Sequence, residues 1–415
     1  MMSNDGTGID PALFRGLTQR RLSRRDLLKY AGSGAGALGL SAVLAACGVS
    51  GTKTSGSQAS KSPGVKEFWA KQSQKGVLDF GNWPPYIDTS HGKHPSLEQF
   101  SKKTGIKVNY RADIQNNDSF FAKISPSLKA GQPTGYDIVV LTNGFYLTQL
   151  IESGWLVPLD HSRIPNFFKY AGKTVKDPAY DPGNKFTVAW QSGMTGIGYN
   201  PKLTKRKITS VNDLFDEKFS GHIGMMSDNT ELGSAGLLKL GIDPVKSTPD
   251  DWNKAAEVLK KQRPLVRQYY DQSYIKALQD GDTYITQAWS GDIFQSQNSG
   301  FPDLEFVVPE EGAMFWTDNM MIPKGAAHPV DAIEWMNFYY QPKIAAEVAD
   351  WVWYITPVPA AKPIIQNDLK DPTVAKSPLV FPDSQMQSRF HDYAEFPNFN
   401  TFQEWNNIFD PIIQS

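Results

Sequence analysis

The chain of 415 residues contains a single cysteine, Cys47. With one cysteine, no disulfide bond can form within the chain, so the fold must be stabilised by its hydrophobic core. The weakly apolar residues 30–46 include four glycines and fall short of the ~20 apolar residues that span a bilayer. Basic and acidic residues nearly balance at a formal net charge of -1, so we expect no nucleic-acid partner.

The N-terminal residues are arranged like a bacterial export signal. The sequence SRRDLLK at 23–29 resembles the twin-arginine motif, and LAACG at 44–48 resembles a lipoprotein cleavage box. A charged region, an apolar region and a small-residue cleavage site follow one another in the order of a signal peptide. We therefore expect residues 1–47 to be a twin-arginine lipoprotein signal, with Cys47 lipidated. The protein would be anchored on the outer side of the cytoplasmic membrane, in the periplasm or on the cell surface.

Common catalytic motifs are also missing. The sequence has no G-x-S-x-G, no H-E-x-x-H and no glycine-rich phosphate loop, and its six histidines are scattered, His91 and His94 being the only close pair. We expect no cofactor, no metal site and no enzymatic activity. Aromatic residues are abundant instead, at 12% with 11 tryptophans. Such a content fits a binding surface, and it also fits large hydrophobic cores.

Beyond the signal, residues 48–67 read as a flexible tether, because Ser, Gly, Thr and Lys dominate the first part of this range without an apolar period. Alternating strand and helix patterns follow, which predict an α/β fold with a mainly parallel sheet and two lobes around a cleft. The expected strands are 77–80, 106–110, 136–141, 222–226, 284–289, 304–308 and 320–323, and the expected helices are 95–104, 120–128, 230–240, 250–261, 328–340 and 343–352.

Several motifs occur in a characteristic order: NWPPY at 82–86, YDIVV at 136–140, WSGD at 289–292, PEEG at 309–312, FWTD at 315–318 and TP at 356–357. Together they resemble the polyamine (spermidine/putrescine) substrate-binding proteins of bacterial ABC importers, over residues 77–363. The resemblance implies a two-lobed periplasmic-binding-protein clamp with hinge crossings between the lobes. Lobe one would hold 76–190 and 316–360, and lobe two 191–315 and 361–415. The protein would be a monomer that delivers a polyamine to an ABC permease in the membrane.

A polyamine needs carboxylates for its ammonium groups and aromatic faces for its methylenes and positive charge. The resemblance implies which residues supply them. The wall of the first lobe would consist of Trp83, Tyr86 and Thr142. The other aromatic residues of the site would be Trp289, Trp316 and Tyr354. The acids would be Asp228, Glu231, Asp292 and Asp318. An acid at Asp292 is similar to the putrescine-preferring members, whereas Pro84 replaces a hydroxyl that spermidine binders often carry. An extra residue within 142–145 also departs from the family pattern.

Each acid has a structural alternative. Asp228 and Glu231 have the spacing of a capping box at the start of a helix, so either could serve the helix and not a ligand. Asp292 could belong to a Gly-Asp turn. Asp318 could be a turn residue after a core tryptophan. Trp316 and Asp318 lie two positions apart, which places both on one side of an extended segment.

Two other functions remain open. The same clamp could bind another small solute: a sugar, thiamine, or iron held by the tyrosine pair Tyr269 and Tyr270. A secreted glycoside hydrolase would use paired carboxylates beside tryptophans. Its acids would be Asp228 or Glu231 with Asp292 or Asp318.

Overall fold

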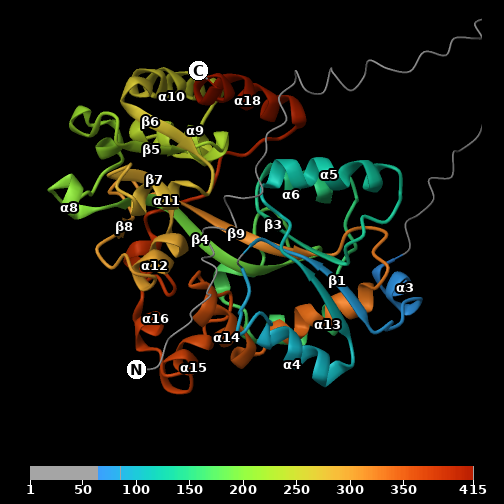
Figure 1. The fold of residues 1–415 in the computed structure, drawn as a ribbon. Coiled ribbons are helices and arrows are strands. Elements are labelled where there is room, and N and C mark those ends of the chain that lie inside the picture. Colours follow the sequence, from blue (N-terminus) through green and yellow to red (C-terminus); the bar gives the residue numbers. More distant parts are fainter. Residues whose placement is uncertain (1–63, 85, 415) are drawn as a thin grey trace, which may run out of the picture. The chain divides into compact units, whose positions relative to one another are not determined.

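A single mixed β-sheet of ten strands runs through residues 64–84 and 86–414, the part of the chain that the computed structural model describes (Figure 1). The strands are β1 Val77–Gly81, β2 Lys107–Arg111, β3 Ile138–Thr142, β4 Thr187–Tyr199, β5 Ile223–Met226, β6 Val266–Tyr270, β7 Ile285–Trp289, β8 Glu305–Val307, β9 Ala313–Met321 and β10 Phe390–His391. Their order is β2-β1-β3-β9-β4-β7-β5-β6, with β10 beside β9 and β8 beside β4. The predicted signal, Cys47 and most of the tether lie outside the described residues.

The two ends of the sheet are parallel, and its middle is antiparallel. β1 runs parallel to β2 and β3, and β5 runs parallel to β6 and β7. Between these groups, β4 and β9 pair antiparallel with each other, β9 with β3, and β4 with β7. The expectation of a mainly parallel sheet is therefore wrong for the centre, because two long strands connect the parallel groups. The β4–β9 register shifts between Ala189 and Gln191.

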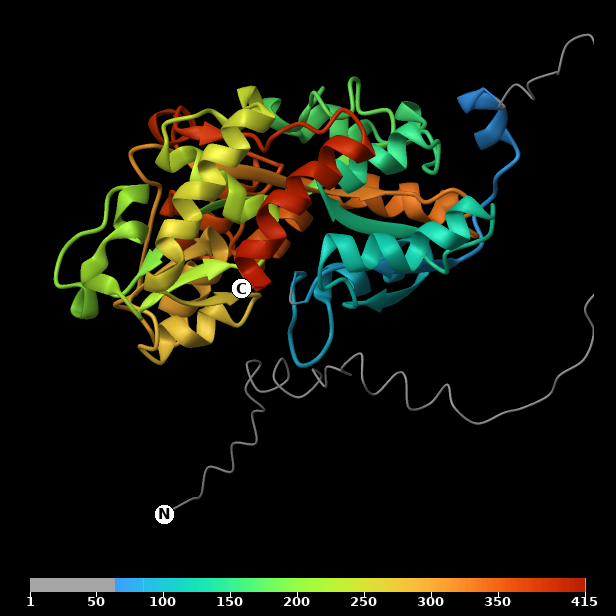
Figure 2. The same ribbon diagram turned by 90° about the horizontal axis from the view of Figure 1, so that it is seen from above.

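Helices cover the sheet in the alternating order that the sequence predicts (Figures 1 and 2). They are α3 Val65–Ala70, α4 Pro95–Thr104, α5 Asn117–Lys129, α6 Phe145–Glu152, α7 Pro165–Tyr170, α8 Pro201–Thr204, α9 Asn229–Lys239, α10 Pro249–Gln262, α11 Tyr274–Gln279, α12 Ser290–Asn298, α13 Pro329–Tyr339, α14 Pro342–Val352, α15 Ala361–Asn367, α16 Pro372–Lys376, α17 Ser384–Gln387 and α18 Phe399–Gln414. No described helix is long and apolar enough to cross a bilayer.

The helix ends follow familiar sequence signals. Proline occupies the first position of α4, where its missing N–H costs nothing and its fixed φ suits a helix. The same helix stops at Gly105, whose φ of 75° belongs to the left-handed region that glycine adopts without strain. These local signals explain why most expected elements match the structure within one to three residues.

Two large hydrophobic cores lie on the two parallel ends of the sheet. One contains Trp190 and Trp335 and draws on β1, β3, α4, α13 and α14. The other contains Trp252 and Trp405 and draws on β5, α9, α10 and α18. Separate cores of this kind are expected for two lobes that a hinge connects. The lobe boundaries given above remain a prediction.

The N-terminal boundary differs from the expectation. Helix α3 begins at Val65, so the expected tether of residues 48–67 extends three residues too far. The reason is Trp69, which is almost fully buried and donates its indole N–H to the carbonyl of Pro158 at 2.8 Å. A buried tryptophan with a satisfied polar atom fixes the helix that carries it.

Candidate functional site

A row of aromatic rings runs from the first core, which includes Tyr86, Tyr354 and Trp316, to Trp289 at the end of β7. Successive ring centroids are 5.4 Å apart for Tyr86 and Tyr354, 5.6 Å for Tyr354 and Trp316, and 6.5 Å for Trp316 and Trp289. Tyr274 continues the row at 6.0 Å from Trp289. These distances fall in the range in which aromatic side chains attract one another. The structure therefore brings together four of the aromatic residues that the sequence pointed to.

Two glycines allow these rings to approach the backbone closely. A Cβ on Gly193 of β4 would lie 2.3 Å from Cζ2 of Trp316, the residue that pairs with Gly193 on β9. A Cβ on Gly291 of α12 would lie 2.5 Å from the ring of Tyr354. Both distances are shorter than any real carbon contact, so glycine is needed at both places.

Asp318 stands at one end of the row, on the same strand as Trp316. It is 5% exposed, and its Oδ1 accepts a hydrogen bond from the hydroxyl of Thr142 at 2.7 Å. Thr142 is itself held by Asn117, whose amide donates to the threonine oxygen at 3.0 Å. Removal from water raises the pKa of Asp318 to about 6, against the opposing effect of Thr142 and of the Tyr86 phenol.

Glu231, on α9, lies beside Trp289 of the row and is also 5% exposed. Its Oε1 accepts from the hydroxyls of Tyr393 at 2.6 Å and Thr195 at 2.8 Å, and from the indole N–H of Trp289 at 3.4 Å. Its Oε2 is buried and has no hydrogen-bond partner among the described residues. Burial, and secondly the nearby Asp228 carboxylate, raise the pKa of Glu231 to about 7.

Thr195 links this acid to the aromatic row. Its hydroxyl accepts from the indole N–H of Trp316 at 3.1 Å and donates to Glu231. The Trp316 ring and the Glu231 carboxylate are thus connected through one side chain of β4. Such a chain of hydrogen bonds fixes both groups with respect to the crossing strands.

Asp228 caps α9, as one of the two sequence hypotheses held. Its Oδ1 accepts from the backbone N–H groups of Thr230 at 2.9 Å and Glu231 at 3.1 Å. Asp228 is exposed at the surface. Partial desolvation of its carboxyl group by neighbouring protein atoms, together with the nearby Asp118 carboxylate, nevertheless raises its pKa. Glu231 does not complete a capping box, because its carboxylate turns toward Tyr393, Thr195 and Trp289. A role for Asp228 at the ligand remains a prediction alongside its cap.

Asp292 lies in the first turn of α12, which begins at Ser290, so the alternative that it belongs to a Gly-Asp turn is wrong. Its two carboxylate oxygens accept from the hydroxyls of Tyr274 at 2.8 Å and Tyr354 at 3.0 Å. Tyr354 and Tyr274 are both members of the aromatic row. Asp292 therefore fixes two rings of the row, whatever else it contacts.

The described residues supply no positive charge for the two buried acids. No lysine, arginine or histidine of this part of the chain forms an ion pair with Asp318 or Glu231, and the groups that shift their pKa values are hydroxyls, an indole and another acid. Ionised carboxylates are rarely buried without a partner, because their transfer from water is costly. The site is thus negative, enclosed by aromatic rings, and suited to a cation.

Trp83 packs against the first core but makes no ring contact with the row among the described residues. Its indole N–H donates to the carbonyl of Val140 at 2.9 Å, and its ring packs against two hydrophobic cores. Phe145, after the inserted residue, is also turned away: it stacks on Phe402 of α18 at 3.9 Å. Contact of Trp83 with a ligand stays a prediction.

Sequence reasoning missed Thr195, Tyr274 and Tyr393, which hold the acids in place. Thr195 lies in a strand that the sequence did not reveal, and a threonine among buried residues carries no functional signal. Tyr393 lies far along the chain from Glu231, so no spacing pattern could relate the two. Their hydroxyls became recognisable through the hydrogen bonds that the fold creates.

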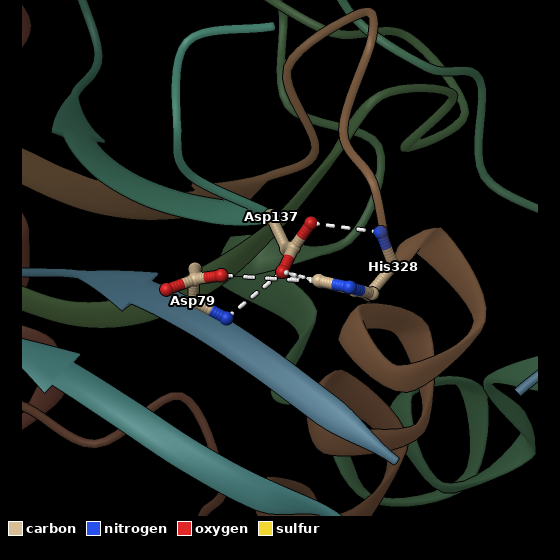
Figure 3. Close-up of side chains that lie close together, drawn as sticks. All are labelled: Asp79, Asp137 and His328. Carbon is tan, nitrogen blue, oxygen red and sulfur yellow. Dashed lines mark hydrogen bonds and ion pairs between the residues drawn. The ribbon is translucent and has the colours of Figure 1, made fainter. Parts of the chain in front are cut away.

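A second cluster of polar groups, Asp79, Asp137 and His328, could in principle hold a metal ion (Figure 3). Their candidate ligand atoms lie within 4.8 Å of one another. The oxygens of Asp137 are already used, because they accept from the backbone N–H groups of Asp79 and His328, both at 2.8 Å, and lie 2.7 Å from the His328 ring. These bonds tie β1 to the start of α13 and explain the cluster without an ion.

Comparison with known proteins places the chain in a family. The model of the bacterial extracellular solute-binding proteins matches residues 96–382. A spermidine/putrescine-binding periplasmic protein of Salmonella typhimurium is 31% identical over 321 residues, which cover 77% of this chain and 87% of the relative. The putrescine-binding periplasmic protein SpuD of Pseudomonas aeruginosa is 29% identical, with 79% of this chain and 89% of the relative covered.

Solved structures agree with the fold. A putative spermidine/putrescine ABC transporter protein from Listeria monocytogenes has a TM-score of 0.71 and 27% identity, covering 81% of this chain and 99% of that one. The spermidine/putrescine substrate-binding protein PotD of Streptococcus pneumoniae has a TM-score of 0.70 and 26% identity, covering 82% and 99%. The expected two-lobed α/β clamp is confirmed as the fold class. This chain belongs to the family of bacterial extracellular solute-binding proteins.

Proposed function

We propose that this protein captures polyamines of the putrescine and spermidine class outside the cytoplasm and delivers them to an ABC importer. The observation that carries the proposal is the pair of buried carboxylates, Asp318 and Glu231, which lack a cationic partner among the described residues and flank a row of aromatic rings. The named function of the relatives in Salmonella and Pseudomonas supports the same ligand class.

The chemistry of a polyamine matches this arrangement part by part. Each ammonium group would neutralise a buried carboxylate and remove the penalty of an unpaired charge. The methylenes would lie against Trp316, Trp289 and Tyr354. Each ammonium over an aromatic face would contribute roughly 0.5–2 kcal/mol. The full ligand set is proposed as Trp83, Tyr86, Thr142, Asp228, Glu231, Trp289, Asp292, Trp316, Asp318 and Tyr354.

Asp292 bears on the length of the amine. Its carboxylate is bridged by two tyrosine hydroxyls that belong to the aromatic row. A negative charge at this place, next to Tyr274 and Tyr354, offers a third point for an ammonium group beside Asp318 and Glu231. We propose that the choice between a diamine and a longer polyamine depends on how the ligand divides its amines among these acids.

The ligand is captured when the two lobes close around it. Lobe one consists of residues 76–190 and 316–360, and lobe two consists of residues 191–315 and 361–415. Strands β4 and β9 would form the hinge between the lobes, because β9 pairs with β3 at one parallel end of the sheet and β4 pairs with β7 at the other. Hinge closure of this kind buries a ligand between rigid bodies. No bond is made or broken, so the protein acts as a receptor and not as an enzyme.

The proposed location follows from the N-terminal sequence. Export by the twin-arginine route and a lipid on Cys47 would hold a monomeric receptor at the outer side of the cytoplasmic membrane, next to its permease.

A thermal melting panel tests the ligand class against the alternatives. Protein lacking residues 1–47 is heated alone and with putrescine, spermidine, maltose, thiamine or iron(III). Binding to the folded state raises the melting temperature by mass action, so the amines should raise it and the other solutes should not. A rise with a sugar, thiamine or iron, and none with an amine, would overturn the proposal.

A further inference from the structure

The last part of the chain reaches the site from outside the residues that the family model matches, 96–382. Strand β10 pairs with β9, Phe390 beside Ala313 and His391 beside Met314, two residues before Trp316. Helix α18 then packs on α9 and α10 (Figure 2). Tyr393 lies between these two elements.

Contacts with α9 and α6 hold α18 in place. The indole N–H of Trp405 donates to the carbonyl of Asn229 at 3.2 Å, in the first turn of the helix that carries Glu231. Phe402 stacks on Phe145 of α6, with the ring planes 9° apart. The segment from β10 to α18 is therefore fixed both at the crossing strands and at α9. Tyr393 is positioned by elements on either side of it.

The Tyr393 hydroxyl uses this position to bind one oxygen of Glu231. It donates to Oε1 at 2.6 Å, and Oε1 also accepts from Thr195 and Trp289. Three donors saturate this oxygen, whereas Oε2 is buried and has no partner among the described residues. A carboxylate oriented in this way has one oxygen fixed by the protein and one oxygen available to accept a hydrogen bond from a ligand.

We propose that Tyr393 is a positioning residue for ligand binding, which holds Glu231 so that Oε2 is presented to an ammonium group of the ligand. The inference rests on the proposed function, and it adds a positioning role for the C-terminal segment. Tyr393 need not touch the ligand. It acts through Glu231.

The charges around Glu231 give this role a measurable signature. Asp228 faces Glu231 from the start of α9, Tyr393 faces it from the C-terminal segment, and no described lysine, arginine or histidine faces it. The phenol bond favours the ionised carboxylate and opposes the rise of its pKa. Without that bond the pKa rises further, and more of Glu231 is protonated at neutral pH. A protonated Glu231 cannot neutralise an ammonium group.

The test compares Tyr393→Phe with wild type by calorimetric titration with putrescine and spermidine at pH 6, 7, 8 and 8.5. Protein lacking residues 1–47 is suitable because it keeps the whole compact unit Pro63–Ser415. We expect Tyr393→Phe to bind about 10- to 100-fold more weakly at pH 7, as for loss of a hydrogen bond to a charged group. The difference in amine affinity between Tyr393→Phe and wild type should become smaller as pH rises, because Glu231 then ionises in the variant as well.

Tyr269→Phe is the matched control, because the Tyr269 hydroxyl is buried on β6 and has no partner among the described residues. It should bind as wild type does at every pH. A second check places Tyr393→Phe in a Glu231→Gln background, where it should cost almost nothing further, since the two residues act as one unit.

The outcomes separate the two proposals. Absence of amine binding by wild type would remove the proposed function itself. Amine binding by wild type, with Tyr393→Phe indistinguishable from it at every pH, would leave the function and overturn the role of Tyr393. A loss of affinity that does not depend on pH, or that persists in the Glu231→Gln background, would also overturn the positioning role.

Discussion

Asp318 and Glu231 are costly residues for the unliganded protein. Each is 5% exposed, and burial raises the pKa of Asp318 to about 6 and that of Glu231 to about 7. Because both pKa values are raised on folding, the folded state binds more protons than the unfolded state. The free energy of unfolding therefore falls as pH rises from the ordinary values of 3.8 for Asp318 and 4.5 for Glu231 to these raised values. An arrangement that weakens the fold near neutral pH is expected where a ligand, and not the core, requires the charge.

Asp318→Asn tests the first of these acids. The variant removes the charge but keeps the size of the side chain, so we expect amine affinity to fall about 10- to 100-fold, which corresponds to a charged hydrogen bond of about 1.5–3 kcal/mol. The melting temperature of the unliganded variant at pH 7 should stay the same or rise, because the ionisation of Asp318 opposes folding there. Calorimetric titration and thermal melting measure the two effects.

Asp303→Asn is the control for this variant. Asp303 is half exposed and pairs with Lys202 at 2.6 Å at the surface, where an ion pair contributes little. Its removal should change neither amine affinity nor melting by much. Undiminished affinity in Asp318→Asn would remove Asp318 from the site.

At this scale the sequence singled out Asp318 and Glu231 as candidates, but not the hydroxyl groups that surround them. Trp316 and Asp318, two positions apart on a strand, could be placed on one side by the alternation of side chains. The partners of Glu231 could not be foreseen, because Thr195 and Tyr393 come from distant segments. Long-range hydrogen bonds appear once the chain is folded, and a single sequence carries no mark of them.

Strand β4 is the element on which the site depends, and the sequence concealed it. All 13 of its residues are buried, on both faces of the sheet. A strand buried on both faces has no alternation of polar and apolar residues to reveal it. Its glycines, serine and threonines also resemble a loop. The strands with local turn signals and a clear apolar run, such as β1 and β3, were predicted to within two residues.

Gly193→Ala tests the close packing of β4 against β9. The new Cβ would lie 2.3 Å from Cζ2 of Trp316, so the indole must move. Overpacking of this kind costs about 1–3 kcal/mol, and the displaced ring would also lose its bond to Thr195. We expect a lower melting temperature, a changed tryptophan fluorescence spectrum and weaker amine binding.

Gly64→Ala is the comparison for that variant, because a Cβ there meets no atom within 4 Å and the backbone does not have a positive φ. It should melt and bind like wild type. If Gly193→Ala behaves in the same way, the close approach of Trp316 to β4 is not needed for the site.

At the scale of the whole molecule, the two hydrophobic cores and the crossing strands explain why the site lies where it does. The aromatic row runs from Tyr86 in the first core to Trp289, which packs on that core and on a smaller cluster that contains Tyr274. A ligand at the proposed site would contact residues from both parallel ends of the sheet, Tyr86 after β1 and Trp289 on β7, so its binding can favour one arrangement of the lobes. The general fold could be predicted from the βαβ rhythm, but the antiparallel centre could not, because it depends on the hidden strand β4.

The most direct measurement is calorimetric titration of protein lacking residues 1–47, at pH 8, with putrescine, cadaverine, spermidine and spermine. At this pH Asp318 and Glu231 are largely ionised, while amines with pKa values near 10 stay protonated. The account predicts micromolar or tighter binding of at least one amine. No heat of binding with any of the four, on folded protein freed of co-purified ligand, would contradict it.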